Sequence, residues 1–203
     1  KYGDARRTDI VKHGIKEFTT EDLVPDEDVI ITITQNGYIK ALPPDTFRTQ
    51  DRGGKGVIGL TTSEADAVAH FFSTTTHSDI LFFTTKGRVF QLKAYEVPKA
   101  SRTSKGQAIV NFLQLAPEEK ITSALPLSEL GDYQFLVMVT ARGFIKKVAL
   151  ADFANVRRSG LIAIKLKRDD ELEWVKPSTG KDTVTLVTAK GQSIRFKESE
   201  VRP

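Results

Sequence analysis

The stretch VIITITQNGYIKAL, residues 29–42, predicts a β-hairpin. β-Branched residues run through its first half, as in a pleated, packed strand. Asn36-Gly37 follows, and this pair is a strong hairpin signal because a type I′ turn requires positive φ at both central residues. The pattern recurs at residues 80–92, 135–148 and 183–196, each time with a Thr three residues before the turn Gly. The hairpin is therefore the unit of a repeat.

The turn glycines are separated by 50, 56 and 48 residues. A period of this size indicates a solenoid or propeller-like array. After each of the first three hairpins come an aromatic residue, a basic loop, a second Gly and another β stretch. We expect the aromatic residues Phe47, Tyr95 and Phe153 to be core or anchor residues, and each unit to supply about four short strands, as a propeller blade does. Lys or Arg precedes the later turn glycines, so a bulged or longer turn is expected there.

The bulk composition limits the protein class. At 203 residues the chain suits one all-β domain or two small ones, and without Cys it has no disulfide framework and no thiolate metal site. No apolar run approaches the ~20 residues of a membrane span, and the charged N-terminal residues are unlike a signal peptide. We therefore expect a soluble intracellular protein with no membrane partner.

The net charge of successive segments alternates in sign with the period of the repeat. The net charges are +2 for residues 31–60, −3 for 61–80, +5 for 81–115, −3 for 116–135, +7 for 136–168 and −3 for 169–185. Each hairpin with its following loop is thus basic, and each linker to the next hairpin is acidic. Because equivalent segments of an array fall on equivalent surfaces, the basic segments should form a stripe suited to a polyanion. The alternative is an ordinary mixed-charge surface.

The first repeat alone continues into a glycine-rich basic loop, Gln50-Asp51-Arg52-Gly53-Gly54-Lys55-Gly56. Glycines let backbone N–H groups approach a ligand closely and form an anion-binding nest. The planar guanidinium group of Arg52 can bind a phosphate with two hydrogen bonds, and the Lys55 ammonium adds a positive charge. Gln50 can donate a hydrogen bond to a phosphate or a sugar. No Ser or Thr follows the lysine, so this is not a Walker P-loop. The loop suits a phosphate backbone; the alternative is a glycine-rich turn with incidental charge.

Residues 50–56 resemble the gyrase-A box, the signature heptapeptide of the C-terminal domain of the DNA gyrase A protein. The family pattern is Gln, usually a basic residue, Arg, Gly, Gly, Lys or Arg, and Gly. Asp51 departs from this pattern and is not assigned a DNA contact. The resemblance also covers the hairpins and residues 2–8, 22–28 and 200–203, which is nearly the whole chain.

The resemblance implies an all-β fold, the β-pinwheel, which is a propeller-like disc of strand-exchanged blades. It also implies that duplex DNA wraps around a basic rim, which gives strand passage its handedness and lets gyrase introduce negative supercoils. The implied partners are double-stranded DNA, the rest of the gyrase A protein, and the gyrase B protein in an A2B2 complex. The implied location is the bacterial cytoplasm, in association with the nucleoid. ATP and Mg²⁺ are implied for the whole enzyme, and no cofactor is expected on this chain.

The expected DNA-binding residues are those of the box and the basic residues of the hairpins and loops. They are Gln50, Arg52, Gly53, Gly54, Lys55, Gly56, Arg48, Lys86, Arg88, Lys99, Arg102, Lys105, Lys146, Lys147, Arg157 and Arg158. No catalytic or metal-binding residue is expected. The family's catalytic tyrosine belongs to an upstream domain, so no tyrosine of this chain takes that role. His13, His70 and His77 have no metal or triad spacing, and we expect His70 and His77 to be surface groups in a polar linker and Trp174 to be a packing residue.

We expect residues 1–14 to be the tail of a linker from an upstream catalytic region. Residues 15–203 are expected to form a partial β-pinwheel of about four blades, truncated at the C-terminus because the fourth repeat ends as its basic loop begins. Three alternatives stay open. They are the equivalent domain of topoisomerase IV, in which the box is usually degraded, a propeller-type interaction scaffold that does not bind DNA, and an enzyme on a β scaffold.

Overall fold

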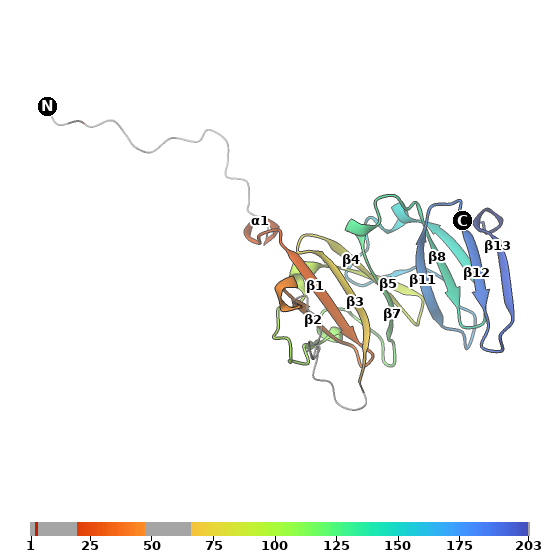
Figure 1. Cartoon of the computed structure of the whole chain (residues 1–203), viewed down its shortest axis with the longest axis horizontal. Coiled ribbons are helices and arrows are strands. Elements are labelled where there is room, and N and C mark those ends of the chain that lie inside the picture. The colour runs from red at the N-terminus through yellow and green to blue at the C-terminus, as the bar shows by residue number, and fades with distance from the viewer. Residues whose placement is uncertain (1–2, 4–19, 48–65, 203) are drawn as a thin grey trace, which may run out of the picture.

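The computed structural model describes residues 3, 20–47 and 66–202 (Figure 1). The strands are β1 (Asp28–Thr34), β2 (Tyr38–Leu42), β3 (Val68–Thr75), β4 (Asp79–Thr84), β5 (Arg88–Lys93), β6 (Gln107–Ala108), β7 (Ile121–Pro126), β8 (Phe135–Thr140), β9 (Ile145–Ala149), β10 (Leu161–Ile162), β11 (Leu172–Ser178), β12 (Thr183–Val187) and β13 (Ser193–Lys197). The helical elements are α1 (Thr20–Leu23) and the short 3₁₀ turns η1 (Pro44–Thr46), η2 (Ala94–Glu96), η3 (Ile109–Asn111), η4 (Leu127–Glu129), η5 (Leu150–Phe153) and η6 (Glu198–Glu200).

These strands form four antiparallel sheets, which we call blades 1 to 4 in chain order (Figure 1). Blade 1 has the strand order β3-β1-β2-β6, blade 2 β10-β5-β4-β7, blade 3 β11-β8-β9 and blade 4 β12-β13. Each predicted hairpin supplies one adjacent pair of strands in its blade. The all-β, propeller-like prediction is therefore confirmed.

Neighbouring blades exchange strands. β6 follows the second hairpin in the sequence but pairs with β2 of the first, with Tyr38 opposite Ala108. In the same way β10 follows the third hairpin but pairs with β5 of the second, with Val89 opposite Leu161. This exchange is the feature that distinguishes a β-pinwheel from a simple propeller, and it confirms the expected architecture.

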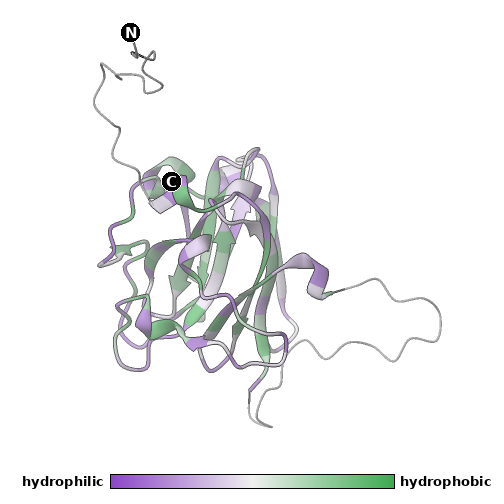
Figure 2. Ribbon diagram, turned by 90° about the vertical axis from the view of Figure 1, so that its left-hand side faces the viewer, coloured by the Kyte–Doolittle hydropathy of each residue, from purple (hydrophilic) through white to green (hydrophobic). Residues whose placement is uncertain are grey.

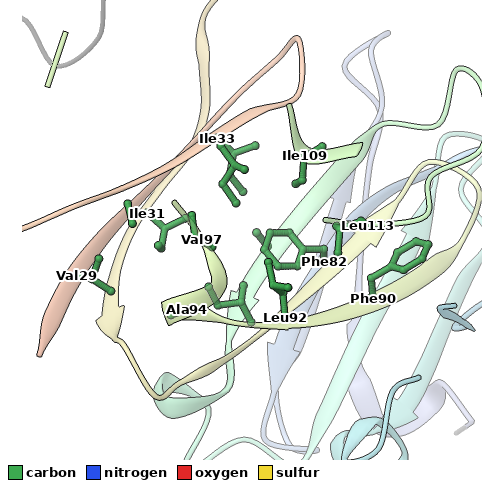
Figure 3. Close-up of a cluster of buried hydrophobic side chains, with 14 residues drawn as sticks. Val29, Ile31, Ile33, Phe82, Phe90, Leu92, Ala94, Val97, Ile109 and Leu113 are labelled. Atoms are coloured by element: carbon green, nitrogen blue, oxygen red, sulfur yellow. The ribbon is translucent and has the colours of Figure 1, made fainter. Parts of the chain in front are cut away.

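Blade 2 is buried on both faces, because consecutive side chains of a strand point to opposite faces of the sheet. Phe82 of β4 packs in one apolar cluster with Ile31 of blade 1, and Figure 3 shows this cluster. The next residue, Phe83, packs in a second cluster with Met138 of blade 3. Fully burying such a side chain stabilises the fold by roughly 1.5–3 kcal/mol, so face-to-face packing is the main force that holds the blades together.

The four hairpins share one turn. The Thr carbonyl accepts a hydrogen bond from the Gly amide at 2.9–3.0 Å, and the Thr hydroxyl accepts one from the next amide at 3.1–3.3 Å. Each turn Gly has φ between +72° and +81°, whereas Asn36 does not have a positive φ. The type I′ prediction for Asn36-Gly37 is therefore wrong. A Gly in the left-handed region after a type I turn forms a bulge, and all four copies have it.

The linkers contain strands that were not predicted from the sequence. β3, β7 and β11 precede the next hairpin but pair with the first strand of the hairpin before them. Each pairing skips one residue at the equivalent place, namely Ala69, Thr122 and Glu173. His70 is therefore a half-buried strand residue rather than part of a linker. Trp174 is 55% exposed, so the prediction that it packs inside is wrong.

The aromatic residues after the hairpins are anchors, as predicted. The edge-to-face ring pairs are Phe47–Phe71, Tyr95–His77 and Phe153–Phe83, with centroids 5.4, 6.4 and 5.8 Å apart. Apolar residues gather in the strands, and polar residues gather in the turns and loops at their ends (Figure 2). Many of the exposed charged groups therefore lie in the turns and loops.

Candidate nucleic-acid interface

The predicted box lies outside the described residues, and so does the basic residue before it. These positions are Arg48, Gln50, Arg52, Gly53, Gly54, Lys55 and Gly56. The predicted DNA-binding residues that the structure describes all belong to the later repeats.

The exposed members of the predicted set are Lys86, Lys99, Arg102, Lys105, Arg157 and Arg158. Most of them belong to two loops, residues 99–106 and 157–160, which lead into β6 and β10. These two strands occupy the same edge position in consecutive sheets. The two basic loops therefore lie on the same edge of neighbouring blades and form consecutive members of one row.

A buried lysine holds the first of these loops at residues 101–105. Lys40 Nζ, on β2, donates hydrogen bonds to the carbonyl oxygens of Ser101, Arg102 and Ser104 at 3.3, 2.6 and 3.0 Å. Lys40 is only 1% exposed, and burial lowers the pKa of its amine. A residue of one blade thus fixes the basic loop of the next repeat.

Two further contacts close this loop against β2. Gly106 has φ +86°, and a Cβ atom there would lie 2.5 Å from the backbone oxygen of Ile39, so only Gly fits. The Lys105 ammonium lies 3.9 Å from the centroid of the Tyr38 ring. Tyr38 and Lys40 are two residues apart on one strand and so share a face.

The second loop is held differently. The Gly160 amide donates to the Arg157 carbonyl at 2.8 Å, and a Cβ at Gly160 would lie 2.7 Å from the Phe90 ring. Phe90 stands three residues after its turn Gly, which is the position that Lys40 has in the first hairpin. Arg158 forms an ion pair with Glu96 at 3.1 Å. The loop therefore rests on an apolar ring, and its guanidinium groups remain exposed.

Three other predicted contacts have partners inside the fold. Arg88 donates to the buried carboxylate of Glu119, with its Nε 2.9 Å from Oε1. Lys146 donates to a backbone carbonyl of the neighbouring loop at 2.9 Å. Lys147 is 5% exposed and donates to the Glu198 carbonyl at 3.3 Å. Because these groups are committed to internal contacts, we base the interface on the exposed residues.

The acidic linkers have a structural use. A buried carboxylate stands two residues before each of β3, β7 and β11 and accepts a hydrogen bond from the adjacent hairpin turn. The bonds run from the Asn36 amide to Asp66 at 3.1 Å, from the Thr84 hydroxyl to Glu119 at 2.6 Å, and from the Arg142 amide to Asp170 at 3.1 Å. Part of the negative charge of the linkers therefore fixes the hairpins and is not displayed on the surface.

Two of these carboxyl groups have a lowered pKa. Burial opposes ionisation of Glu119, but hydrogen bonds from Arg88, Thr84 and a backbone amide outweigh it, and the pKa falls. Burial also opposes ionisation of Asp170, and the Thr140 hydroxyl with two backbone amides again lowers the pKa. Both groups are therefore carboxylates at neutral pH.

Several basic residues near this row were not predicted from the sequence. Lys165, Lys167 and Arg168 are exposed, and the two lysines line a cavity of about 400 Å³ beside β9. The Lys167 ammonium lies 4.0 Å from the Phe144 ring. The sequence feature that could have predicted them is the run Lys-Leu-Lys-Arg at residues 165–168, in the most basic segment. Lys40 was also missed, and its signal was a charged residue between two apolar neighbours in a strand.

The described residues offer ammonium, guanidinium and amide donors, which bind anions. Among residues 20–47 and 66–202, no group of three or more His, Asp or Glu is arranged to hold a metal ion. No helix in these same ranges is long and apolar enough to cross a membrane.

The sequence matches the family model described as the DNA gyrase C-terminal domain, beta-propeller, over residues 28–75, 78–128, 134–179 and 182–203. The chain is 48% identical to the DNA gyrase A protein of Clostridium acetobutylicum, over 100% of this chain and 24% of that protein. It thus spans about a quarter of this relative's length.

Two solved structures share the fold. The C-terminal domain of DNA topoisomerase IV matches with a TM-score of 0.74 and 29% identity, over 88% of this chain and 54% of that chain. The DNA gyrase A C-terminal domain matches with a TM-score of 0.65 and 25% identity, over 87% of this chain and 56% of that chain.

Proposed function

Because this chain belongs to the DNA gyrase C-terminal domain family, we propose that it binds duplex DNA along the row of basic loops and wraps the duplex around its edge. The observation that carries this proposal is the position of two exposed basic loops on the same edge of consecutive blades. In gyrase, such a wrap gives strand passage its handedness and so allows negative supercoiling.

The chemistry of the row favours phosphates over bases. Lysine and arginine side chains on short loops reach phosphate oxygens easily, whereas base readout needs a helix or a ribbon that enters a groove. The described edge presents loops and two-residue strands. We therefore expect weak sequence preference, arising from the bendability of the duplex.

The repeat spacing meets an energetic need of wrapping. Bending 20–30 base pairs by 40–90° costs about 1–6 kcal/mol, so contacts must recur along the path to offset it. One basic loop in each of the first three repeats provides that recurrence. The box at residues 50–56 is proposed as the loop of the row with the most phosphate donors, and as the loop that fixes one point of the DNA path.

A topology assay tests wrapping directly. A nicked circle is ligated with the chain bound at saturation, and the linking number is counted after the protein is removed. A shift in linking number is expected; an unchanged linking number at saturating protein would refute wrapping. Simple binding is measured separately by the salt dependence of duplex affinity, whose log–log slope is near −0.9 per neutralised phosphate.

Charge removal on opposite sheet edges provides a matched control. Arg102→Gln removes one charge from the loop that precedes β6, on the basic edge, and should flatten the salt slope by about one. Lys120→Gln removes one exposed charge beside β7, on the opposite edge of the neighbouring sheet, and should leave the slope unchanged. Equal effects of the two changes would contradict binding along one edge.

The proposed partners beyond DNA follow from family membership. They are the rest of the gyrase A protein and the gyrase B protein in an A2B2 complex, which uses ATP and Mg²⁺, in the bacterial cytoplasm at the nucleoid. A second candidate is the equivalent role in topoisomerase IV, favoured by the TM-score of 0.74. The 48% identity to a gyrase A protein and the intact sequence Arg52-Gly53-Gly54-Lys55-Gly56 favour gyrase. A scaffold that does not bind DNA would instead give a salt slope near zero.

A further inference from the structure

Three peptide groups of the loop at residues 101–105 point their carbonyl oxygens at one buried ammonium, that of Lys40. The described peptide bonds are all trans, and in a planar trans peptide the N–H points away from the C=O. The N–H groups that share these peptides belong to Arg102, Thr103 and Lys105. These three amides are therefore turned away from Lys40.

The three amides face solvent. Arg102, Thr103 and Lys105 are exposed, and within the described part of the chain their amides donate to no protein acceptor. The Ser104 amide is already used, because it donates to the Ser101 carbonyl at 3.2 Å. Because the carbonyls converge on one ammonium, the amides point outward as separate donors, and the exposed side chains of Arg102 and Lys105 add positive charge beside them.

We propose that Lys40 is a positioning residue, and that it holds the 101–105 loop with its outward amides available to the phosphates of duplex DNA. The inference rests on the proposed function and deepens it, because it assigns backbone amides as phosphate ligands in addition to basic side chains. Lys40 itself does not touch the DNA. It acts by keeping the carbonyls inward, which leaves the amides on the outer face.

The third repeat shows why the buried cation matters. Phe90 of the second hairpin packs against the loop of the third repeat, in the position that Lys40 has in the first hairpin, and the loop Gly of the third repeat follows its turn Gly by 17 residues instead of 19. An aromatic ring fills space but does not orient carbonyl groups. The 157–160 loop must therefore bind with its guanidinium groups, whereas the 101–105 loop can bind with its backbone as well.

Amide chemical shifts of the whole chain test the inference. The protein is labelled with ¹⁵N and titrated at low salt with a duplex of about one and a half helical turns, roughly 16 base pairs. We expect the Arg102, Thr103 and Lys105 amides to move downfield and saturate together with the overall binding curve. In Lys40→Met this response should disappear, and duplex affinity should fall about fivefold to tenfold, the size expected for one ordinary net hydrogen bond.

Two further variants separate positioning from charge. Lys40→Arg keeps a buried cation with several donors and should restore much of the Thr103 response. Lys86→Met removes one exposed charge at a hairpin tip, so it should weaken affinity but leave the Thr103 response intact. If Lys40→Met does not fold, the wild-type titration still tests the phosphate contact, and Lys40→Gln takes the place of Lys40→Met in the test of positioning.

Each outcome has one meaning. If the duplex binds and the amides of the 157–160 loop move while that of Thr103 does not, the phosphate site at 101–105 is overturned and the proposed function stands. If no amide of the chain responds to the duplex, both are overturned. A Thr103 response that persists in Lys40→Met overturns the positioning role of the lysine.

Discussion

Gly106→Ala should detach the exchanged strand from blade 1, and Gly143→Ala is its natural control. Both glycines lie in the left-handed region, at φ +86° and +81°. A Cβ at Gly106 would meet the Ile39 oxygen at 2.5 Å and the Lys40 Cβ at 3.1 Å, whereas a Cβ at Gly143 would meet nothing within 4 Å. The two changes thus share a backbone penalty and differ only in the clash.

The magnitude follows from these contacts. Placing Ala at a left-handed position costs about 1–2 kcal/mol, and Gly143→Ala should lose only that much of the free energy of unfolding. At Gly106 the loop must also move away, which removes the β6 pairing and the bond from the Ile109 amide to the Gly37 carbonyl at 2.8 Å. Each lost hydrogen bond adds about 1 kcal/mol, so the total is about 3–5 kcal/mol.

Urea unfolding gives the free energy of unfolding of both variants, and hydrogen exchange at the Ile39 amide reports the edge of blade 1. We expect Gly106→Ala to be the less stable variant by at least about 1.5 kcal/mol, with faster exchange at Ile39. Equal stability of the two variants would show that β6 does not press on β2, and the account of the exchanged strand would be wrong.

Three further predictions concern charge. Glu119→Gln should make the stability of the fold depend less on pH in acid. The lowered pKa of Glu119 stabilises the fold fully above the ordinary glutamate pKa of about 4.3, and this contribution is lost as the pH falls through the lowered value. Thermal melts between neutral pH and pH 3 measure the difference between the variant and the wild type. Arg157→Gln combined with Arg158→Gln should reduce the salt slope of duplex affinity by about two, measured by fluorescence anisotropy, and an unchanged slope would remove the 157–160 loop from the interface. Replacing residues 50–56 by alanines should abolish the shift in linking number while much of the simple binding remains, and a retained shift would show that the box is dispensable for wrapping.

The hairpins could be predicted from the sequence because each element of their pattern has a local cause. Alternating β-branched residues favour a strand, and the turn Gly adopts a backbone conformation that other residues avoid. The repeated Thr could be seen in the sequence, but the structural role of its hydroxyl could not. Its hydroxyl accepts a bond from the residue after the Gly, which is a property of the bulged turn and not of the type I′ turn that Asn36-Gly37 suggested.

The strands β3, β7 and β11 could not be predicted in the same way. Each carries polar residues and a bulge, so the period of two is interrupted, and each pairs with a hairpin that lies before it in the chain. The contacts that bury Lys40 and Lys147 were also beyond local reasoning. Both lysines look like surface charges in the sequence, and only the neighbouring repeat supplies the carbonyl groups that satisfy them.

Because of strand exchange, the conformation of each basic loop depends on residues of the preceding repeat. The 99–106 loop belongs to the second repeat but is fixed by Tyr38 and Lys40 of the first, and the 157–160 loop is fixed by Phe90 of the second. Damage within one blade should therefore disorder the proposed phosphate contacts of the repeat that follows. By linkage, a ligand that binds only the ordered loops stabilises the contacts that order them. DNA bound along several loops should thus strengthen the interfaces between blades, and binding at one loop should favour binding at the next.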